Sequence, residues 1–256
     1  MPHFELCAES LASALTAQAG GADRIELCTQ LSLSGTTPDL AATQTAVKAL
    51  TIPVHVLIRP RPGNFVYTAE EFALIRRQIQ EAKAAGAAGV VIGILHPNNQ
   101  VDIERTRALA TLAAPMHITF HRAFDETPSL PHALEDVIAT GAQTVLTSGG
   151  QPTAIAGATQ IAALHRQAAG RIAIMAGSGL TPANIAAFAQ TTNVPWLHGS
   201  LLRKPDAGAP RLASETWDIP PQTAMPSAQQ SQPTTPAGQL HIEDIREVMH
   251  QLHQAN

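Results

Sequence analysis

Two short acid-and-thiol motifs lie near the start of the chain, Glu5-Leu6-Cys7 and Glu26-Leu27-Cys28, and they contain both of its cysteines. Paired thiolates are soft ligands that favour Cu(I) and zinc. The alternative is two small residues that fill space in a core, because free cysteine is among the most buried residue types. The glutamates are costly to bury, so each needs a partner or a function. We take Cys7 and Cys28 as candidate metal ligands.

A pair of arginines lies in the motif IRPRPGNFVY, on either side of a proline. Arginine suits bidentate capture of a carboxylate or phosphate, so Arg59 and Arg61 are candidates for anion binding. They could instead pair with Glu5 and Glu26 in a structural network. The two interpretations are compatible, since such networks also orient catalytic carboxylates.

The motif ITFHRAFDE places a histidine just before an arginine and an aspartate. A histidine beside carboxylates can act as a general acid or base near neutral pH. We therefore take Glu26, His121 and Asp125 as candidate catalytic residues. His55 lies early in its apolar run, and we expect it to be structural.

Small residues follow three later apolar runs, in LTSGGQ, IMAGSGLTP and LHGSLL. Small residues let backbone N–H groups approach an anion, which is typical of phosphate-binding loops. Glycine-rich segments are also common turns, so the pattern is weak when taken alone. The candidate anion-binding residues of these loops are Gly177, Ser178, Gly179, Gly199 and Ser200.

The apolar runs that carry these motifs alternate with helical patterns along the chain. They read HFELC, RIELC, PVHVLI, GVVIGIL, MHITFH, TVLTS, RIAIMA and PWLHGS. Eight strand-helix units with right-handed crossovers predict an α/β fold, a single-domain (β/α)8 TIM-type barrel. A doubly wound open sheet is the alternative. Thr37-Pro38 and Thr181-Pro182 have the pattern of helix starts.

In such a barrel the active site forms at the carboxyl ends of the strands. Glu and Cys are two residues apart in each repeated motif, so they share the inward face while Leu6 and Leu27 point to the helices. Adjacent strands lie about 4.8 Å apart, which brings the two cysteines near each other, subject to the stagger of the barrel. A sulfur separation of about 4 to 5 Å would allow linear Cu(I) coordination, and about 7 Å or more would require backbone movement.

The periodic pattern is interrupted once. Residues 1–203 are expected to hold strands one to eight with helices one to seven. Residues 204–238 are rich in Pro, Gln, Ser and Thr, and we expect a flexible insertion there. Residues 239–256 have apolar residues at helical spacing, which favours an eighth helix that completes the barrel over a free amphipathic tail.

Composition excludes several classes of protein. The net charge is −4 with 16 Lys plus Arg, which gives no basic surface for nucleic acid or for an anionic membrane. The lysines, Lys48, Lys83 and Lys204, avoid the strands, so a Schiff-base aldolase is excluded. The sequence MPHFELCAES lacks the features of an export signal, and we expect a cytoplasmic protein with reduced thiols.

The motifs GADRIELC, IRPRPGNFVY, TFHRAFDE, VLTSGG and IMAGSG, in this order and spacing, resemble those of the CutC family of copper homeostasis proteins. The resemblance spans about Phe4 to Ser200. It implies a TIM-type barrel, a cytoplasmic location, a homo-oligomer (dimer or tetramer), and copper handling with Cys7 and Cys28 as Cu(I) ligands. The family pattern has no long Pro/Gln-rich stretch, so residues 204–238 depart from it.

Two functions remain open, and both require a small-molecule or metal ligand. The first is a copper-binding protein that holds Cu(I) through the paired thiols. The second is a barrel enzyme that acts on a small anionic or phosphorylated metabolite by acid/base chemistry, because two Arg, two Glu and a His are more than a two-thiol ion site requires.

Overall fold

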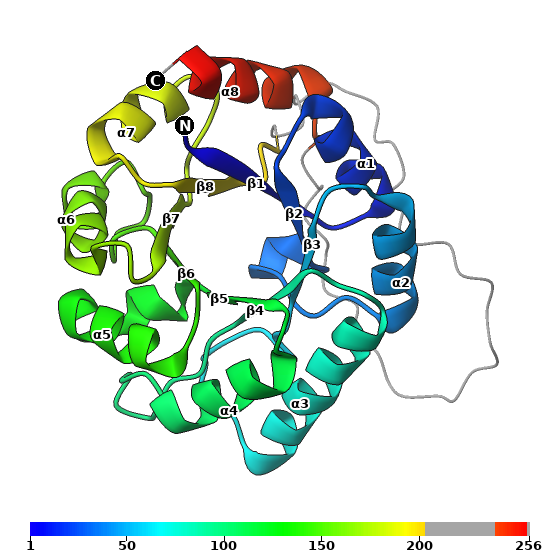
Figure 1. Ribbon diagram of the computed structural model, residues 1–256, viewed down its shortest axis with the longest axis vertical. Coiled ribbons are helices and arrows are strands. Elements are labelled where there is room, and N and C mark those ends of the chain that lie inside the picture. Colours follow the sequence, from blue (N-terminus) through cyan, green and yellow to red (C-terminus); the bar gives the residue numbers. More distant parts are fainter. Residues whose placement is uncertain (203–238, 255–256) are drawn as a thin grey trace.

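The structure is a computed structural model that describes residues 1–202 and 239–254. Eight parallel strands form a closed barrel in sequence order, in which β8 pairs with β1 (Figure 1). This confirms the predicted TIM-type barrel. The strands are β1 (His3–Ala8), β2 (Arg24–Leu27), β3 (Val54–Leu57), β4 (Gly89–Ile92), β5 (His117–Phe120), β6 (Thr144–Thr147), β7 (Ala173–Gly177) and β8 (Trp196–Gly199).

The helices form a ring around the barrel (Figure 1). They are α1 (Leu11–Gly20), α2 (Leu40–Ala49), α3 (Ala69–Ala84), α4 (Ile103–Ala113), α5 (Leu130–Thr140), α6 (Ala158–Ala168), α7 (Ile185–Thr192) and α8 (Ile242–Gln254), with 3-10 turns η1 (Leu31–Leu33) and η2 (Arg122–Glu126). Helix α2 is capped by Asp39 and α7 begins after Asn184, so both helices start later than the Thr-Pro patterns indicate.

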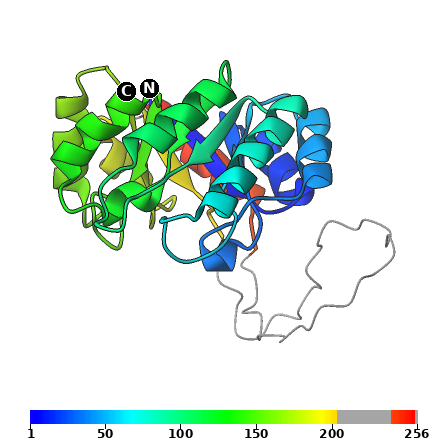
Figure 2. The same ribbon diagram turned by 90° about the horizontal axis from the view of Figure 1, so that it is seen from below.

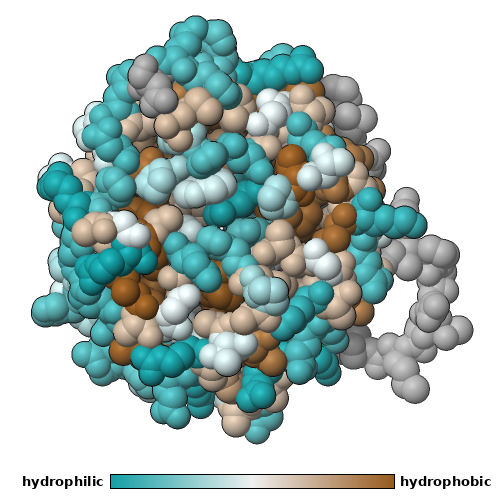
Figure 3. All heavy atoms as spheres, in the orientation of Figure 1, coloured by the Kyte–Doolittle hydropathy of each residue, from teal (hydrophilic) through white to brown (hydrophobic). Residues whose placement is uncertain are grey.

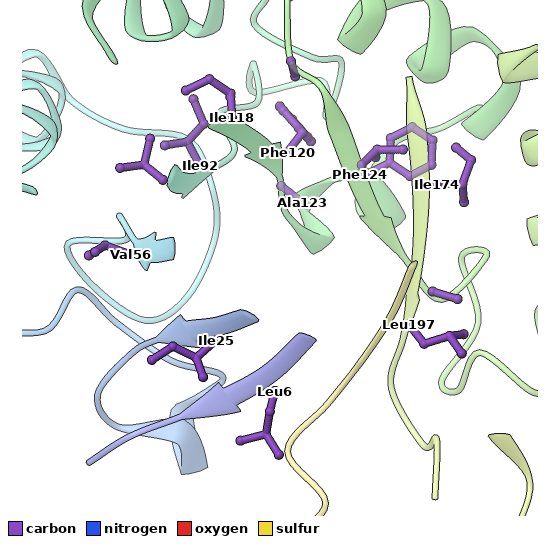
Figure 4. Close-up of a cluster of buried hydrophobic side chains, with 14 of the residues drawn as sticks. Leu6, Ile25, Val56, Ile92, Ile118, Phe120, Ala123, Phe124, Ile174 and Leu197 are labelled. Carbon is purple, nitrogen blue, oxygen red and sulfur yellow. The ribbon is translucent and has the colours of Figure 1, made fainter. Parts of the chain in front are cut away.

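The main hydrophobic core lies between the barrel and the helices, whereas a smaller cluster lies inside the barrel. Outward strand residues such as Leu6 and Ile25 pack in the main core (Figure 4). The inner cluster contains Cys7, Cys28, Leu57 and Val91. This division confirms that the cysteines point inward while the leucine between each Glu and Cys points outward.

Helix α8 closes the helical ring by packing between α1 and α7 (Figure 1). The contact with α1 is close: a Cβ added at Gly20 would lie 2.6 Å from the Ile245 side chain. Glycine at this position therefore lets the two helices approach. The expected insertion at residues 204–238 lies outside the described residues.

The N-terminus and the end of α8 lie near each other at one end of the barrel, and η1 lies at the opposite end (Figure 2). In the view down the barrel, hydrophilic residues cover much of the outer rim and also appear at the centre, and hydrophobic residues show mainly between the two (Figure 3). Among the described helices, none is long and apolar enough to cross a membrane.

Candidate functional site at the barrel mouth

A pocket of about 840 Å³ opens at the carboxyl ends of the strands. This is the end at which such barrels build their active sites. Most of the residues singled out from the sequence line it. They are Cys7, Glu26, Arg59, His121, Asp125, Ser178, Gly179, Gly199 and Ser200.

The two thiols lie next to each other at the base of this pocket. The Sγ atoms of Cys7 and Cys28 are 3.3 Å apart, which is hydrogen-bonding distance for sulfur. The separation is below the range expected for linear Cu(I) coordination, and it requires no backbone movement. Cys7 lines the pocket, whereas Cys28 is fully buried. The hydrogen bond with Cys28, together with burial, raises the pKa of the Cys7 thiol well above its usual range.

Glu5 lies inside the barrel beside Arg24, a residue that the sequence motifs did not single out. Arg24, on the neighbouring strand β2, donates from Nε to a carboxylate oxygen of Glu5. His198 Nδ1 lies 2.8 Å from the other oxygen. Burial alone would raise the pKa of Glu5, but the charge of Arg24 and the hydrogen bond from His198 outweigh it and hold the pKa far below its usual range. Glu5 is therefore a buried, paired carboxylate.

The second glutamate lies on the far side of the same imidazole. His198 Nε2 is 3.4 Å from Glu26 Oε2, so the ring bridges Glu5 and Glu26. Burial raises the pKa of Glu26 to about 7, although the charge of His198 opposes this. The pKa of His198 is raised despite its burial, because Glu5 accepts its hydrogen bond and Glu26 adds a second negative charge. A carboxyl group and an imidazole at this distance are the kinds of group that act as general acid and base.

Three donor atoms of different kinds converge here. The Cys7 sulfur, a Glu26 carboxylate oxygen and a His198 ring nitrogen all lie within 4.8 Å of one another. All three residues line the pocket. His198 did not belong to the expected site. The sequence contained one indication of it, namely that His198 is a polar residue at an inward position of the last strand. Closure of the barrel brings that position beside β1.

His121 is buried against Phe65, with ring centroids 4.8 Å apart, and Gly93 leaves room for its ring. Its Nδ1 accepts a hydrogen bond from the backbone of Ala123, and its Nε2 has no partner within the described residues. Burial, reinforced by the charge of Arg59, lowers the pKa of His121 to about 3. The ring is therefore neutral near pH 7, which argues against an acid/base role.

Asp125 holds the loop that follows β6. It accepts hydrogen bonds from the backbone N–H groups of Ser148 and Gly150, and Arg122 pairs with it at 2.9 Å. The Thr147 hydroxyl donates to it as well. These contacts indicate a role in positioning the loop.

The two arginines of IRPRPGNFVY have different surroundings. Arg59 is buried, and its guanidinium donates to the carbonyls of Leu33, Gly35 and Gly63, which ties two loops of the mouth together. Arg61 pairs with Glu71 on α3 and does not line the pocket. Neither arginine pairs with Glu5 or Glu26, because Arg24 and His198 take those positions.

The small residues at the carboxyl ends of β7 and β8 form one side of the pocket. Ser178 has a φ of 84° and donates its hydroxyl to the Pro152 carbonyl, and Gly179, Gly199 and Ser200 lie beside it on the pocket wall. Gly177 lies within β7 and does not line the pocket. A Cβ there would lie 2.8 Å from Leu146 and 3.3 Å from His198, so Gly177 makes room for these side chains.

Comparison with known proteins places the barrel in a family. A model of the CutC family matches residues 3–203. The chain belongs to the CutC family. The CutC family protein of Chromobacterium violaceum is 46% identical over 197 residues, covering 77% of this chain and 80% of that protein. That of Porphyromonas gingivalis is 45% identical over 198 residues, covering 77% and 80%.

Solved structures agree with this assignment. The copper homeostasis protein CutC of Streptococcus agalactiae is 33% identical, with a TM-score of 0.75 over 78% of this chain and 99% of that one. Phosphoribosylanthranilate isomerase of Thermotoga maritima is 13% identical, with a TM-score of 0.58 over 99% of this chain and 100% of that one. The second likeness shows the barrel fold alone. The resemblance to CutC in the sequence motifs is thus confirmed.

Proposed function

We propose that this CutC-family protein binds Cu(I) between Cys7 and Cys28. The observation that carries the proposal is the 3.3 Å separation of the two sulfur atoms. Thiolates are the soft donors that Cu(I) prefers. The name of the S. agalactiae relative, a copper homeostasis protein, supports the same ligand.

The paired thiols fit Cu(I) in donor type and in access. Two sulfurs on opposite sides of one ion would be about 4 to 5 Å apart, from metal–sulfur bonds of about 2.3 Å. The thiols would therefore lose their mutual hydrogen bond and separate by about 1 Å, which side-chain rotation supplies. Cys7 lines the pocket and offers the entry path, and Cys28 is the ligand behind it.

An anaerobic titration of the reduced full-length protein tests the proposal. With a competing Cu(I) chelator that reports free ion by its colour, we expect one equivalent bound. Cys7→Ser and Cys28→Ser should each lose binding, and the double variant should lose no more than either alone. Stoichiometric Cu(I) retained by the double variant would contradict the thiol site.

A second candidate is an enzyme that acts on a small anionic or phosphorylated metabolite. It is favoured by the pocket, whose base carries Glu26 and His198 and whose wall carries the backbone of Ser178 to Gly179 and Gly199 to Ser200. Backbone N–H groups at such loops suit an anion. Glu26 with His198 would transfer the proton. Arg59 would act by holding the mouth in shape.

Thermal shift with a panel of phosphorylated metabolites tests this second candidate on chelator-treated protein. We expect a stabilising member that inorganic phosphate alone does not match. Gly179→Val distorts the pocket wall, because the residue has a φ of 74° and its Cβ would lie 2.9 Å from the Thr153 side chain, so it should remove that stabilisation while Cu(I) binding persists. If no metabolite of the panel raises the melting temperature of the wild-type protein, the enzyme proposal is excluded.

We further propose that the protein lies in the cytoplasm, where the thiols stay reduced. It also takes the protein to be a homo-oligomer, a dimer or tetramer. Light scattering on the purified protein measures the subunit number, and a monomer across micromolar concentrations would contradict this part.

A further inference from the structure

The cluster of Cys7, Glu26 and His198 differs from the two-thiol site in both geometry and donor type. The three residues come from β1, β2 and β8, which are neighbours because the barrel is closed. Their donor atoms lie within 4.8 Å of one another, and Cys28 is not among them. We infer that Cys7, Glu26 and His198 form a zinc site, distinct from the Cu(I) site although it shares one sulfur.

The donor set suits zinc. Zinc is bound in proteins by Cys sulfur, His nitrogen and carboxylate oxygen, in four-coordinate tetrahedral geometry. The 3.4 Å between His198 Nε2 and Glu26 Oε2 is a spacing that two ligands of one tetrahedral ion can keep with little movement. The third donor, the Cys7 sulfur, lies within 4.8 Å of the other two, so it would have to approach them by about 1 Å to share the ion.

The surroundings of His198 are those of a metal ligand. A metal-bound histidine almost always gives its other ring N–H to a carboxylate or a carbonyl, which fixes the ring and its tautomer. Here Nδ1 lies 2.8 Å from Glu5 Oε1, and Arg24 fixes that carboxylate in turn. Nε2 is thereby directed at Glu26 and the pocket. A chain of three residues therefore holds this one nitrogen in place.

The charges also balance for a divalent ion. Glu5 is neutralised by Arg24, so Glu26 and the Cys7 thiolate carry the two charges that face the ion. Zinc would make the cluster neutral, and the thiol proton would leave to solvent on binding.

The site has three protein ligands, which is the number found in catalytic zinc sites. Three protein ligands leave the fourth position for a water molecule or an oxygen of a ligand, whereas structural zinc sites have four protein ligands. Cys7, Glu26 and His198 all face the pocket of about 840 Å³. The fourth position therefore opens on the pocket. The occupant would be an oxygen donor small enough for that volume.

Zinc binding to full-length, chelator-stripped, reduced protein tests the inference. Equilibrium dialysis against buffered Zn²⁺ should give one equivalent for the wild type. Cys7→Ser, Glu26→Gln and His198→Gln should each weaken binding by more than about 100-fold, the upper end of what loss of an orienting partner costs. Cys28→Ser should keep the zinc but lose Cu(I), which separates this site from the proposed copper site.

Matched controls are the variants Glu104→Gln on α4 and His132→Gln on α5. Both residues are exposed, so these variants should bind zinc as the wild type does.

X-ray absorption on the zinc-loaded wild type gives a second measurement that needs no variant to fold. We expect one sulfur at about 2.3 Å with nitrogen and oxygen at about 2.0 to 2.2 Å. Two sulfurs, no bound zinc, or unchanged binding by Glu26→Gln and His198→Gln would each overturn the inference.

Discussion

Glu5 and His198 are 193 residues apart in the sequence, yet they are joined at 2.8 Å where the first and last strands of the barrel meet. This contact orients the imidazole that faces Glu26, and it depends on barrel closure. Any change that disturbs the pairing of β1 with β8 should therefore disturb the candidate site as well.

Removing Arg24 should leave Glu5 as an unpaired buried charge. We expect Arg24→Met to lower the free energy of unfolding by about 3 to 5 kcal/mol, because a broken buried pair leaves its desolvation uncompensated. The double variant Glu5→Gln/Arg24→Met should recover much of this loss. Urea unfolding of the two variants and the wild type measures both effects, and equal stability of the single and double variants would contradict the pairing.

His121 should make stability depend on pH in the acid range. Its pKa is lowered by burial from 6.5 to about 3, so between these values the unfolded chain binds a proton that the folded protein does not. The free energy of unfolding should then fall with falling pH by about 1.4 kcal/mol per unit from this residue. The effect is absent above about pH 6.5.

Urea unfolding at several pH values between 4 and 7 checks the contribution of His121. His121→Asn keeps an acceptor for the Ala123 N–H and should flatten the slope by up to about 1.4 kcal/mol per pH unit. His132→Gln changes an exposed histidine on α5 and is the control, because it should leave the slope of the unfolding free energy against pH unchanged. An unchanged slope in His121→Asn would show that the ring is protonated in the folded state.

A side chain at Gly20 should push α8 away from the barrel. The Cβ of Gly20→Ala would lie 2.6 Å from Ile245, so we expect a loss of about 1 to 3 kcal/mol, the cost of overpacking a core. Ile245→Ala should relieve part of the clash when combined with it. Gly199→Ala is the control, since its nearest contact would be 3.7 Å. Thermal unfolding compares the three.

Asp125→Asn should loosen the loop after β6. The amide keeps one acceptor oxygen but loses the charge that holds Arg122 and the backbone N–H groups of Ser148 and Gly150. Hydrogen exchange of those two amides should become faster, and stability should fall by about 1 to 3 kcal/mol. Exchange at the wild-type rate would show that the loop holds its shape without the carboxylate.

The regular part of the fold could be predicted from the sequence because its signals are local. Apolar runs and helical patterns alternate every few residues, and the side-chain period of two places the Glu and Cys of each repeated motif inward. The first residues of the helices could be predicted less closely than the strands. Asp39, two residues after Thr37, caps α2, since several residue types near a helix start can accept the same backbone N–H bond.

The site itself depends on contacts that no local pattern contains. His198 and Arg24 reach Glu5 only because β8 closes on β1, and the sequence alone does not reveal the stagger that sets this register. Arg61 was expected at the mouth, yet Glu71 on α3 draws it outward. Glu71 also accepts a hydrogen bond from the Thr68 backbone at the start of α3, and its pairing with Arg61 links two segments that no local sequence pattern connects.

Closure of the barrel also sets the order in which the chain can complete its fold. During synthesis β1 emerges first, and its outer edge has no partner until β8 follows nearly the whole barrel later. Contacts so distant in sequence form slowly, because a long loop must close before they contribute. Until β8 is in place Glu5 lacks His198, and the incomplete sheet keeps an open edge of the kind that can pair with other chains.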